Sequence, residues 1–458
     1  VVRQGASIRA ELLGPPHPQD TERSPLRLPF LVTIKDQDHA VLKIQGTTRT
    51  LRRGEYSDWI HVSFSGGWGV RIYGVCKFLW VAAEPHFELY VTPLNIDPER
   101  PAMRIGYPAV YPIYLAKRQG AYATLGLAED TWGLNEHVLD DDSFLQQCLD
   151  TDREREAMFF DALDKVPRGL CVCVFDGSDR MQHMFWRYLD EQHPSHPPNG
   201  LPRHRHAIDD LYQRMDQLVG RTMAKCDRDG TLLMVLSDHG FNTFRTGVDL
   251  NRWLEQNGYL KVDDARRNEE YLAGVDWSQT RAFALGLTGI FLNLRDRFSQ
   301  GIVDSGSEAE QLRDEIVQRL SGLTEPESGA NAIKKVYQAT QVYRGPYKNQ
   351  APDLIVGYDR GFRVSWEAAA GRTTREVFHA NTKAWSGDHC VDPSLVPGIL
   401  FCNRPLLTEN PRLLDIAPTV LDLFGIATPA HMDGKALVIG DRAVAAADIP
   451  PLPAKQVT

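Results

Sequence analysis

The chain has 458 residues, of which 42% are hydrophobic and 24% are charged, and its formal net charge at pH 7 is -9. This length and apolar content suffice for a large core, in one big domain with an insertion or in two modest domains. The acidic balance argues against a nucleic-acid polymer or an anionic membrane as partner, so an anionic substrate must be attracted locally, for which metal ions are suited.

Neither a membrane span nor a disulfide framework is indicated. The longest apolar runs, residues 169–175 and 232–236, are far shorter than the roughly 20 residues that cross a bilayer. Of the seven cysteines, Cys171 and Cys173 lie inside an apolar strand pattern, and no CxxC pair occurs, so reduced thiols and a cytoplasmic location are expected. The sequence starts at Val1 without a signal-like stretch, and we expect it to be a piece of a longer chain. The sequence does not identify the oligomeric state.

The N-terminal part predicts a connector followed by a small β-rich unit. Residues 1–27 are rich in proline and charge, which is typical of a connector. Residues 28–95 contain short β-like runs separated by turn residues, and they predict a small antiparallel sheet as an insert or accessory domain. The expected strands are residues 28–36, 39–44, 59–64, 69–75 and 87–93. Whether this unit is a lid, a specificity insert or a partner-binding surface stays open.

Residues 96–168 predict a bridge of loops and one long helix, with Asp142 or Ser143 as the helix N-cap. Residues 169–440 then alternate apolar runs with amphipathic helices. This pattern favours an α/β core with a doubly wound, mostly parallel sheet, which would be the metal-binding catalytic core. Residues 441–458 are the expected C-terminal tail.

The elements of this core follow from periodicity and capping residues. Strands are expected at residues 169–177, 231–240, 353–359 and 398–403. One helix is expected over residues 208–219, where apolar residues recur at helical spacing. A second is expected to begin at Ser307, with Glu310 in capping-box spacing, and a third covers residues 413–426, with Gly425 placed to end it.

In open α/β sheets, ligands bind beyond the carboxyl ends of the strands, so the polar residues that follow the apolar runs are the first candidates for a site. Asp179 and His183 follow the run at residues 169–175 and are four residues apart. On a helix they would share one face and could reach one metal ion. Taken alone, the same pair is as readily an acidic residue near a helix N-terminus and a surface histidine.

Two further histidines follow other apolar runs. Asp238 and His239 end the second expected strand and combine a carboxylate with an imidazole, which suits Zn²⁺ or Mn²⁺. The structural alternative is that Asp238 caps a turn and that His239 is satisfied by the backbone. His389 lies in a loop with Gly387 and Asp388; by itself it is an ordinary loop histidine, but with the other motifs it completes a set.

The order of these motifs resembles the metal-binding half of the alkaline phosphatase superfamily, and within it the type I phosphodiesterase and nucleotide pyrophosphatase branch. The resemblance covers about residues 169–440 and rests on D-x-x-x-H, S-D-H-G-F, G-D-H and a closing APTVLDLFGI with MDGKAL.

This resemblance implies two-metal-dependent hydrolysis of a small phosphate ester, with Zn²⁺ as the expected metal and Mn²⁺ as the alternative. It implies that Asp179, His183 and His389 hold one ion. Asp238 and His239 would hold the second, together with an earlier Asp and a nucleophilic Thr or Ser.

The sequence departs from the family pattern where the nucleophile belongs. It should follow an apolar strand that ends in Asp, but the run at residues 28–36 ends in Asp36 and leads into another β-like run. Thr124 and Thr131 are the next hydroxyls, yet no apolar strand precedes them. We therefore expect the nucleophile to lie upstream of this chain, and the chain alone to be a poor catalyst that holds nearer one ion than two.

Other interpretations stay open from sequence alone. Arg180 and Asn242, next to the metal motifs, are candidate substrate contacts, although a solvated arginine and a packed asparagine are simpler alternatives. The chain could also be a sulfatase, a relative of cofactor-independent phosphoglycerate mutase, or a non-catalytic binding domain of the same fold. Five ligand-type residues at strand ends argue against the last, and we predict that their side chains converge in one pocket.

Overall fold

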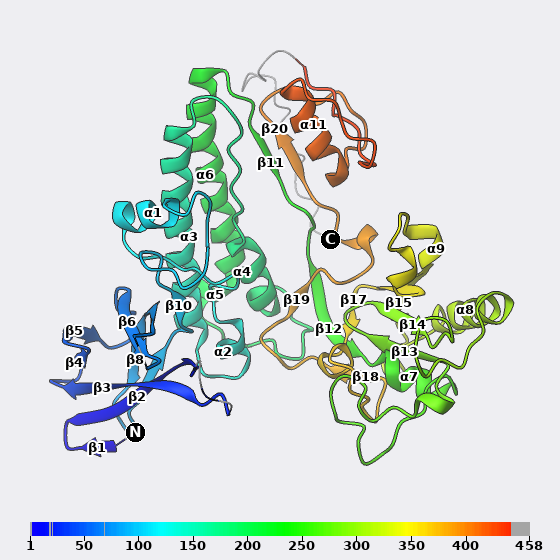
Figure 1. Cartoon of the computed structure of the whole chain (residues 1–458), viewed down its shortest axis with the longest axis horizontal. Coiled ribbons are helices and arrows are strands. Elements are labelled where there is room, and N and C mark those ends of the chain that lie inside the picture. Colours follow the sequence, from blue (N-terminus) through cyan, green and yellow to red (C-terminus); the bar gives the residue numbers. More distant parts are fainter. Residues whose placement is uncertain (1, 18–19, 21, 68, 441–458) are drawn as a thin grey trace. The chain divides into compact units, whose positions relative to one another are not determined.

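The computed structural model describes residues 2–17, 20, 22–67 and 69–440, and the expected C-terminal tail at 441–458 lies outside them. The contacts between residues divide the chain into two units. The first holds Val1–Met184 and Leu201–Ala207, and the second holds Phe185–Gly200 and Ile208–Thr458. Both units combine helices and strands, so the chain is of mixed α/β type (Figure 1).

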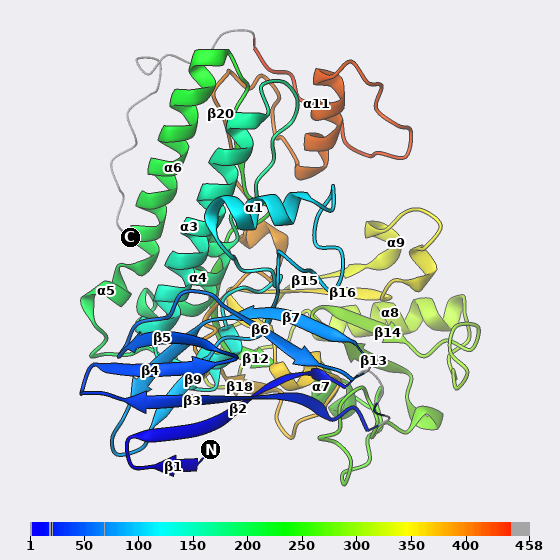
Figure 2. The same cartoon turned by 60° about the vertical axis from the view of Figure 1, so that its left-hand side comes forward.

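A five-stranded antiparallel sheet opens the first unit (Figure 2). Its strands pair in sequence order: β1 (Val2–Gln4), β2 (Ser7–Pro16), β3 (Pro25–Ile34), β4 (His39–Ile44) and β5 (Thr47–Arg52). Burial alternates along β3, so Leu28 and Val32 enter the core while Arg27 is exposed. β1 and β2 occupy residues whose proline and charge content predicted a connector. Strand pairing tolerates these prolines because they lie at the end of β2, where the register with β3 shifts between Leu13 and Pro16.

Five more strands complete the β-rich part of the first unit. They are β6 (Ile60–Ser65), β7 (Arg71–Cys76), β8 (Phe78–Ala82), β9 (Glu88–Val91) and β10 (Asn95–Ile96), with β6, β7 and β10 in one antiparallel sheet and β8 paired with β9. Phe78 and Trp80 are fully buried in the same core cluster as Val32 and Leu42. The five strands predicted between residues 28 and 95 are confirmed, because each combines apolar alternation with flanking turn residues.

The helices of the first unit follow the strands. They are α1 (Tyr111–Gln119), α2 (Thr131–Asn135), α3 (Asp141–Lys165), α4 (Gly177–Phe185, whose last residue belongs to the second unit) and α5 (Pro202–Arg205). The long helix predicted in the bridge is α3. Its N-cap is Asp140, whose side chain accepts a hydrogen bond from the Ser143 amide, so the helix begins slightly before the expected cap at Asp142 or Ser143.

The described residues of the second unit form three separate sheets (Figure 1). The first pairs β11 (Met234–Leu236) with β20 (Leu400–Cys402). The second surrounds β12 (Asn242–Val248) with β17 (Gly361–Val364), β18 (Phe378–Ala380) and β19 (Gly387–Asp388). The third has the order β13 (Ala282–Leu285), β14 (Gly289–Leu292), β16 (Leu354–Tyr358) and β15 (Ile333–Gln338).

The prediction of a doubly wound, mostly parallel sheet is wrong for the described residues. Among the named strands, only β12 and β17 pair in parallel, whereas β11 and β20 pair antiparallel. Residues 169–175, expected to be a strand, form no ladder, and Val172 and Val174 are 73% and 71% exposed. An apolar run indicates that a segment can form a strand, but the pattern carries no information on the direction or presence of a neighbour.

The remaining helices lie in the second unit. They are α6 (Ala207–Asp229, whose first residue belongs to the first unit), α7 (Leu250–Gln256), α8 (Ser307–Leu320), α9 (Ala339–Val342), α10 (Trp366–Ala369) and α11 (Ile416–Leu423), with short 3-10 turns at Trp186–Tyr188, Trp277–Gln279, Lys348–Gln350, Pro393–Leu395 and Leu413–Asp415. The three predicted helices correspond to α6, α8 and α11. Gly425 follows α11 with φ of 68°, as its predicted role in ending the helix requires. The capping box at Ser307 is not formed, because the N-cap is Gly306 and no side chain caps the helix.

In the part of the chain that the structure describes, no helix is long and apolar enough to cross a membrane.

The Asp190 side chain links residues 185–200 to β12 through hydrogen bonds and an ion pair. Its carboxylate accepts two hydrogen bonds from Arg245, with Nε–Oδ2 of 2.6 Å and Nη2–Oδ1 of 2.7 Å, and a third from the Thr243 hydroxyl. Burial alone would raise the pKa of Asp190, but the hydrogen bonds from Arg245 and Thr243 outweigh it and hold the pKa below its ordinary value.

Asp190→Asn should therefore destabilise the protein at pH 7 and have less effect in acid. A lowered native pKa adds stability above the unfolded value of about 3.9, and this stability is lost as the pH falls through the native pKa. At pH 7 we expect the free energy of unfolding, measured with urea, to fall by about 2 kcal/mol.

The exposed pair of Asp304 with Arg295, at 2.8 Å, is the matched control in the same unit. Asp304→Asn should change the free energy of unfolding by less than about 1 kcal/mol. A difference between the wild type and Asp190→Asn that stays constant on acidification would contradict this account of the ion pair.

Candidate metal centre

Asp179 and His183 lie on α4 in the first unit. Gly177 begins the helix, and a side chain there would collide with the carboxylate of Asp152, so glycine lets the two segments approach. The Asp179 Oδ1 and His183 Nε2 atoms are 3.4 Å apart, and His183 is 2% exposed. The predicted helical face shared by these two residues is present, and their ligand atoms are close enough to bind one cation.

A buried acid next to Asp179 was not identified from the sequence. Arg180 donates to the Asp179 carboxylate, and its Nε lies 3.9 Å from Oε2 of Glu129, which is 2% exposed. Burial raises the pKa of Glu129. In this structure the Arg180 guanidinium lies beside these carboxylates, and its predicted contact with substrate stays a prediction. No sequence signal identifies Glu129, because it stands in an irregular segment.

Asp238 and His239 follow β11 in the second unit, as predicted. The Asp238 side chain is 70% exposed and that of His239 is 24% exposed. His239 Nδ1 donates to the Gly240 carbonyl oxygen at 3.0 Å, which makes Nε2 the nitrogen that carries the lone pair. This backbone contact was the structural alternative for His239, but a metal-binding histidine makes the same contact through its second nitrogen.

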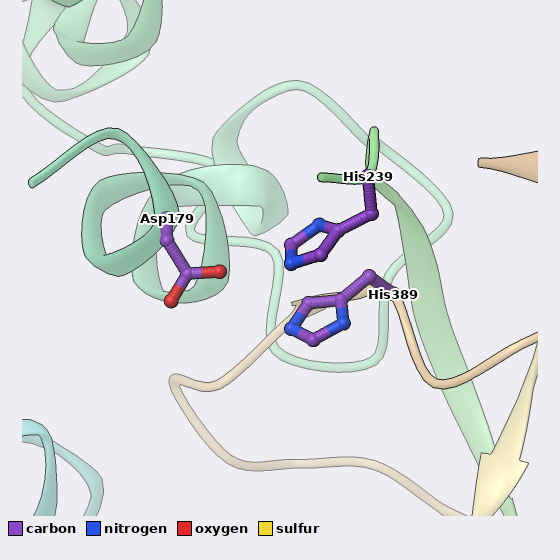
Figure 3. Close-up of side chains that lie close together, drawn as sticks. All are labelled: Asp179, His239 and His389. Atoms are coloured by element: carbon purple, nitrogen blue, oxygen red, sulfur yellow. The ribbon is translucent and has the colours of Figure 1, made fainter. Parts of the chain in front are cut away.

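His389 is brought to His239 by strand pairing. It follows β19, in which Asp388 pairs with Asn242 of β12. The two imidazole rings stack with centroids 3.6 Å apart and planes inclined by 14° (Figure 3). Phe241 packs against both, with centroid distances of 5.6 Å to His239 and 5.4 Å to His389. A histidine pair separated by 150 residues in the chain is thus placed side by side within the second unit.

The stacked imidazoles place two metal-ligand side chains side by side in the second unit. An imidazole nitrogen binds a divalent metal through its lone pair. Asp238, next to His239, adds a carboxylate in the same unit. These three side chains would therefore hold divalent cations, which would supply positive charge for an anionic ligand.

Two predictions remain, the contact of Asn242 with substrate and the convergence of the five candidate metal ligands. Asn242 is 6% exposed, and its Oδ1 accepts from the Thr243 amide at 2.8 Å, so a substrate contact there stays a prediction. Asp179 and His183 belong to the first unit, whereas Asp238, His239 and His389 belong to the second. The convergence of all five side chains in one pocket therefore stays a prediction as well.

Asp388 and Cys390, on either side of His389, are poor candidates for metal ligands although their ligand atoms are near it. The Asp388 carboxylate forms an ion pair with Arg363 at 2.8 Å and accepts from the Trp385 indole at 2.8 Å. Burial raises the pKa of the Cys390 thiol to about 12, so the thiol is protonated when no cation is bound. Arg363 has no sequence signal, because a charged residue in an apolar run is expected to be exposed.

Asp36 and Thr124 have hydrogen-bond partners in the first unit, and Thr131 is buried there. The Thr124 hydroxyl donates to the Ile96 carbonyl oxygen at 3.0 Å. Thr131 begins α2 and is 9% exposed. Asp36 lies in the turn between β3 and β4, where its carboxylate accepts from the His39 amide at 2.8 Å.

Comparison with known proteins places these motifs in a family. The profile of the type I phosphodiesterase / nucleotide pyrophosphatase family matches residues 47–388, more than half of the chain. No curated protein matches the chain. The solved structure of murine ectonucleotide pyrophosphatase / phosphodiesterase 5 is similar, with 15% sequence identity and a TM-score of 0.27. The similarity covers 56% of this chain and 61% of that chain, so this chain spans less than two thirds of the murine structure.

Proposed function

Because the chain belongs to the type I phosphodiesterase / nucleotide pyrophosphatase family, we propose that it is a two-metal-dependent hydrolase of phosphoric esters. The observation that carries this proposal is the stack of His239 on His389, which sets two imidazole ligands side by side. Zn²⁺ is the preferred metal, since the ligands combine imidazoles with carboxylates, and Mn²⁺ is the alternative.

The proposed ligands form two sets. Asp179, His183 and His389 hold one ion, and Asp238 and His239 contribute to holding the other. Divalent ions in such a site stabilise the negative charge on the attacking and leaving oxygens of the phosphoryl group. The protein's own contribution is to keep the ligands oriented: the Gly240 carbonyl fixes the tautomer of His239, and Phe241 limits the rotation of both imidazoles.

We propose a Thr or Ser hydroxyl as the nucleophile, by resemblance to the family. The serines next to the metal motifs are not proposed for this role, because each is hydrogen-bonded to the backbone. The Ser178 hydroxyl donates to Phe175, the Ser237 hydroxyl accepts from Ile399, and the Ser386 hydroxyl accepts from Arg187.

Family membership removes two of the alternatives that the sequence left open. A sulfatase and a relative of phosphoglycerate mutase would belong to other branches of the superfamily. The competing proposal is a non-catalytic binding domain of the same fold. Unlike a metal-dependent hydrolase, such a domain does not need to bind phosphate in a metal-dependent manner.

Binding of inorganic phosphate separates these two functions without requiring turnover. We expect calorimetry to detect phosphate binding to the Zn²⁺-loaded chain and none after treatment with a chelator, because the metal ions provide the positive charge that an acidic chain lacks. His389→Ala should weaken phosphate binding at least about tenfold, by loss of a metal ligand.

His431→Ala is the control, since this histidine is exposed and lies in the same unit. It should bind phosphate as the wild type does. Phosphate binding that is equal with and without metal would contradict the proposed hydrolase.

The proposal includes a reducing compartment such as the cytoplasm. The seven cysteines form no disulfide bond in the described part of the chain, and Cys76, Cys148 and Cys226 are buried. Disulfides are typical of secreted proteins of small size, so thiols that are not joined by disulfides support a reducing environment.

A further inference from the structure

A buried ion pair lies directly beside the candidate ligand His389. Arg363 on β17 and Asp388 on β19 are 5% and 1% exposed, and their Nε and Oδ2 atoms are 2.8 Å apart. Both strands pair with β12, one parallel and one antiparallel. The ion pair therefore joins two strands that both pair with β12, and β12 begins shortly after the motif of Asp238 and His239.

Both oxygens of the Asp388 carboxylate are engaged. Oδ2 accepts a hydrogen bond from the indole of Trp385 at 2.8 Å and forms the ion pair with Arg363. Oδ1 accepts from the backbone amides of His389 and Cys390, also at 2.8 Å each. The second set of contacts fixes the backbone on both sides of the His389 α-carbon, so the carboxylate controls the direction in which the imidazole leaves the chain.

Arg363 is itself held in place by aromatic rings. Its guanidinium lies 4.5 Å from the ring centroid of Trp366 and 5.1 Å from that of Phe244. Trp366 in turn packs at 90° against Trp385, which donates to Asp388. These rings restrict the guanidinium, which forms the ion pair with Asp388, and Asp388 in turn holds the backbone amides of His389 and Cys390.

A buried ion pair gives little net stability, because the cost of removing two charges from water offsets their attraction. Apolar residues of similar size would often stabilise a core equally well. Stability alone thus does not account for a charged pair at this depth, whereas a fixed orientation of the neighbouring loop does.

We propose that Arg363 and Asp388 are positioning residues that hold His389 in register with His239 for metal binding. This inference rests on the proposed function, since it concerns the same metal site. Neither residue binds the ion; each acts through the backbone of residues 388–390. Loss of an outer partner of a metal ligand typically lowers metal affinity about 10–100-fold.

Arg363→Lys tests the proposal, because lysine keeps the charge but loses the planar fork and the stacking. The matched control is Arg267→Lys: the Arg267 side chain is 7% exposed, pairs with Glu255 at 3.1 Å in the same unit, and donates to the Thr374 carbonyl oxygen. The readout is Zn²⁺ affinity of the 458-residue chain, measured by competition with a chromophoric chelator, together with the melting temperature.

Both variants should melt at lower temperature than the wild type, but only Arg363→Lys should weaken the tighter Zn²⁺ by about 10–100-fold. Asp388→Asn, which preserves the shape of the side chain, should weaken Zn²⁺ binding similarly. This variant provides the test if the lysine variant does not fold. Unchanged Zn²⁺ affinity in a folded Arg363→Lys or Asp388→Asn variant overturns the inference. If His389→Ala also leaves Zn²⁺ affinity unchanged, the proposed metal site fails instead.

Discussion

His389→Ala is expected to release the more tightly held of the two ions. In the proposed assignment, the variant leaves that ion with only Asp179 and His183, whereas zinc sites in proteins normally have at least three protein ligands. Affinity for the ion should fall by at least about 100-fold, because the outer partners of a ligand alone contribute about 10–100-fold. Metal content per chain after dialysis, followed by Zn²⁺ titration, measures the loss.

His239→Ala should affect the other ion. The chain offers that ion Asp238 and His239, so its affinity is expected to be low even in the wild type and lower still in the variant. His183→Ala should reproduce the loss seen for His389→Ala, since both serve the same ion. His431→Ala is again the control. Unchanged metal content in both His389→Ala and His239→Ala would contradict the assignment of ligands.

The second large effect concerns turnover. The 458-residue chain, loaded with Zn²⁺ or Mn²⁺, is expected to hydrolyse bis-p-nitrophenyl phosphate and p-nitrophenyl phosphate at a negligible rate. Covalent catalysis needs a positioned hydroxyl, and removing one costs up to about 10⁶-fold in rate. Among the described residues, the hydroxyls of Ser178, Ser237 and Ser386 next to the metal motifs are bonded to the backbone.

Release of p-nitrophenolate at 405 nm measures this rate, with a chelator-treated sample as the blank. Thr124→Ala and Thr131→Ala should change nothing, because the Thr124 hydroxyl bonds to Ile96 and Thr131 is buried at the start of α2. Rapid metal-dependent turnover would contradict the prediction, and its loss in one of these two variants would identify the nucleophile.

The β-rich part of the first unit was predictable because its information is local. Three of its predicted strands, β3, β4 and β6, alternate more buried and more exposed side chains between turn residues. β5 was not predicted, since its side chains are mostly polar. The parallel order of the core was predicted wrongly, because apolar runs such as residues 169–175 and β11 do not specify which strand lies beside them.

For the site, the sequence identified the ligand types and their order but not what holds them. Asp179 with His183 and Asp238 with His239 are local pairs, so spacing alone brings them together. The stacking of His239 on His389 depends on the pairing of β12 with β19, which no local pattern encodes. Arg363 and Glu129 could not be found either, because their burial is set entirely by tertiary packing.

The segment of residues 169–175, which joins no sheet, also affects how the protein behaves at high concentration. Its backbone lies outside any ladder, while Val172 and Val174 project from it into solvent. An exposed, uncharged, strand-forming segment without proline is a template for pairing between molecules. Copies of the chain are thus prone to self-associate here, and a lysine in place of either valine is suited to suppress aggregation.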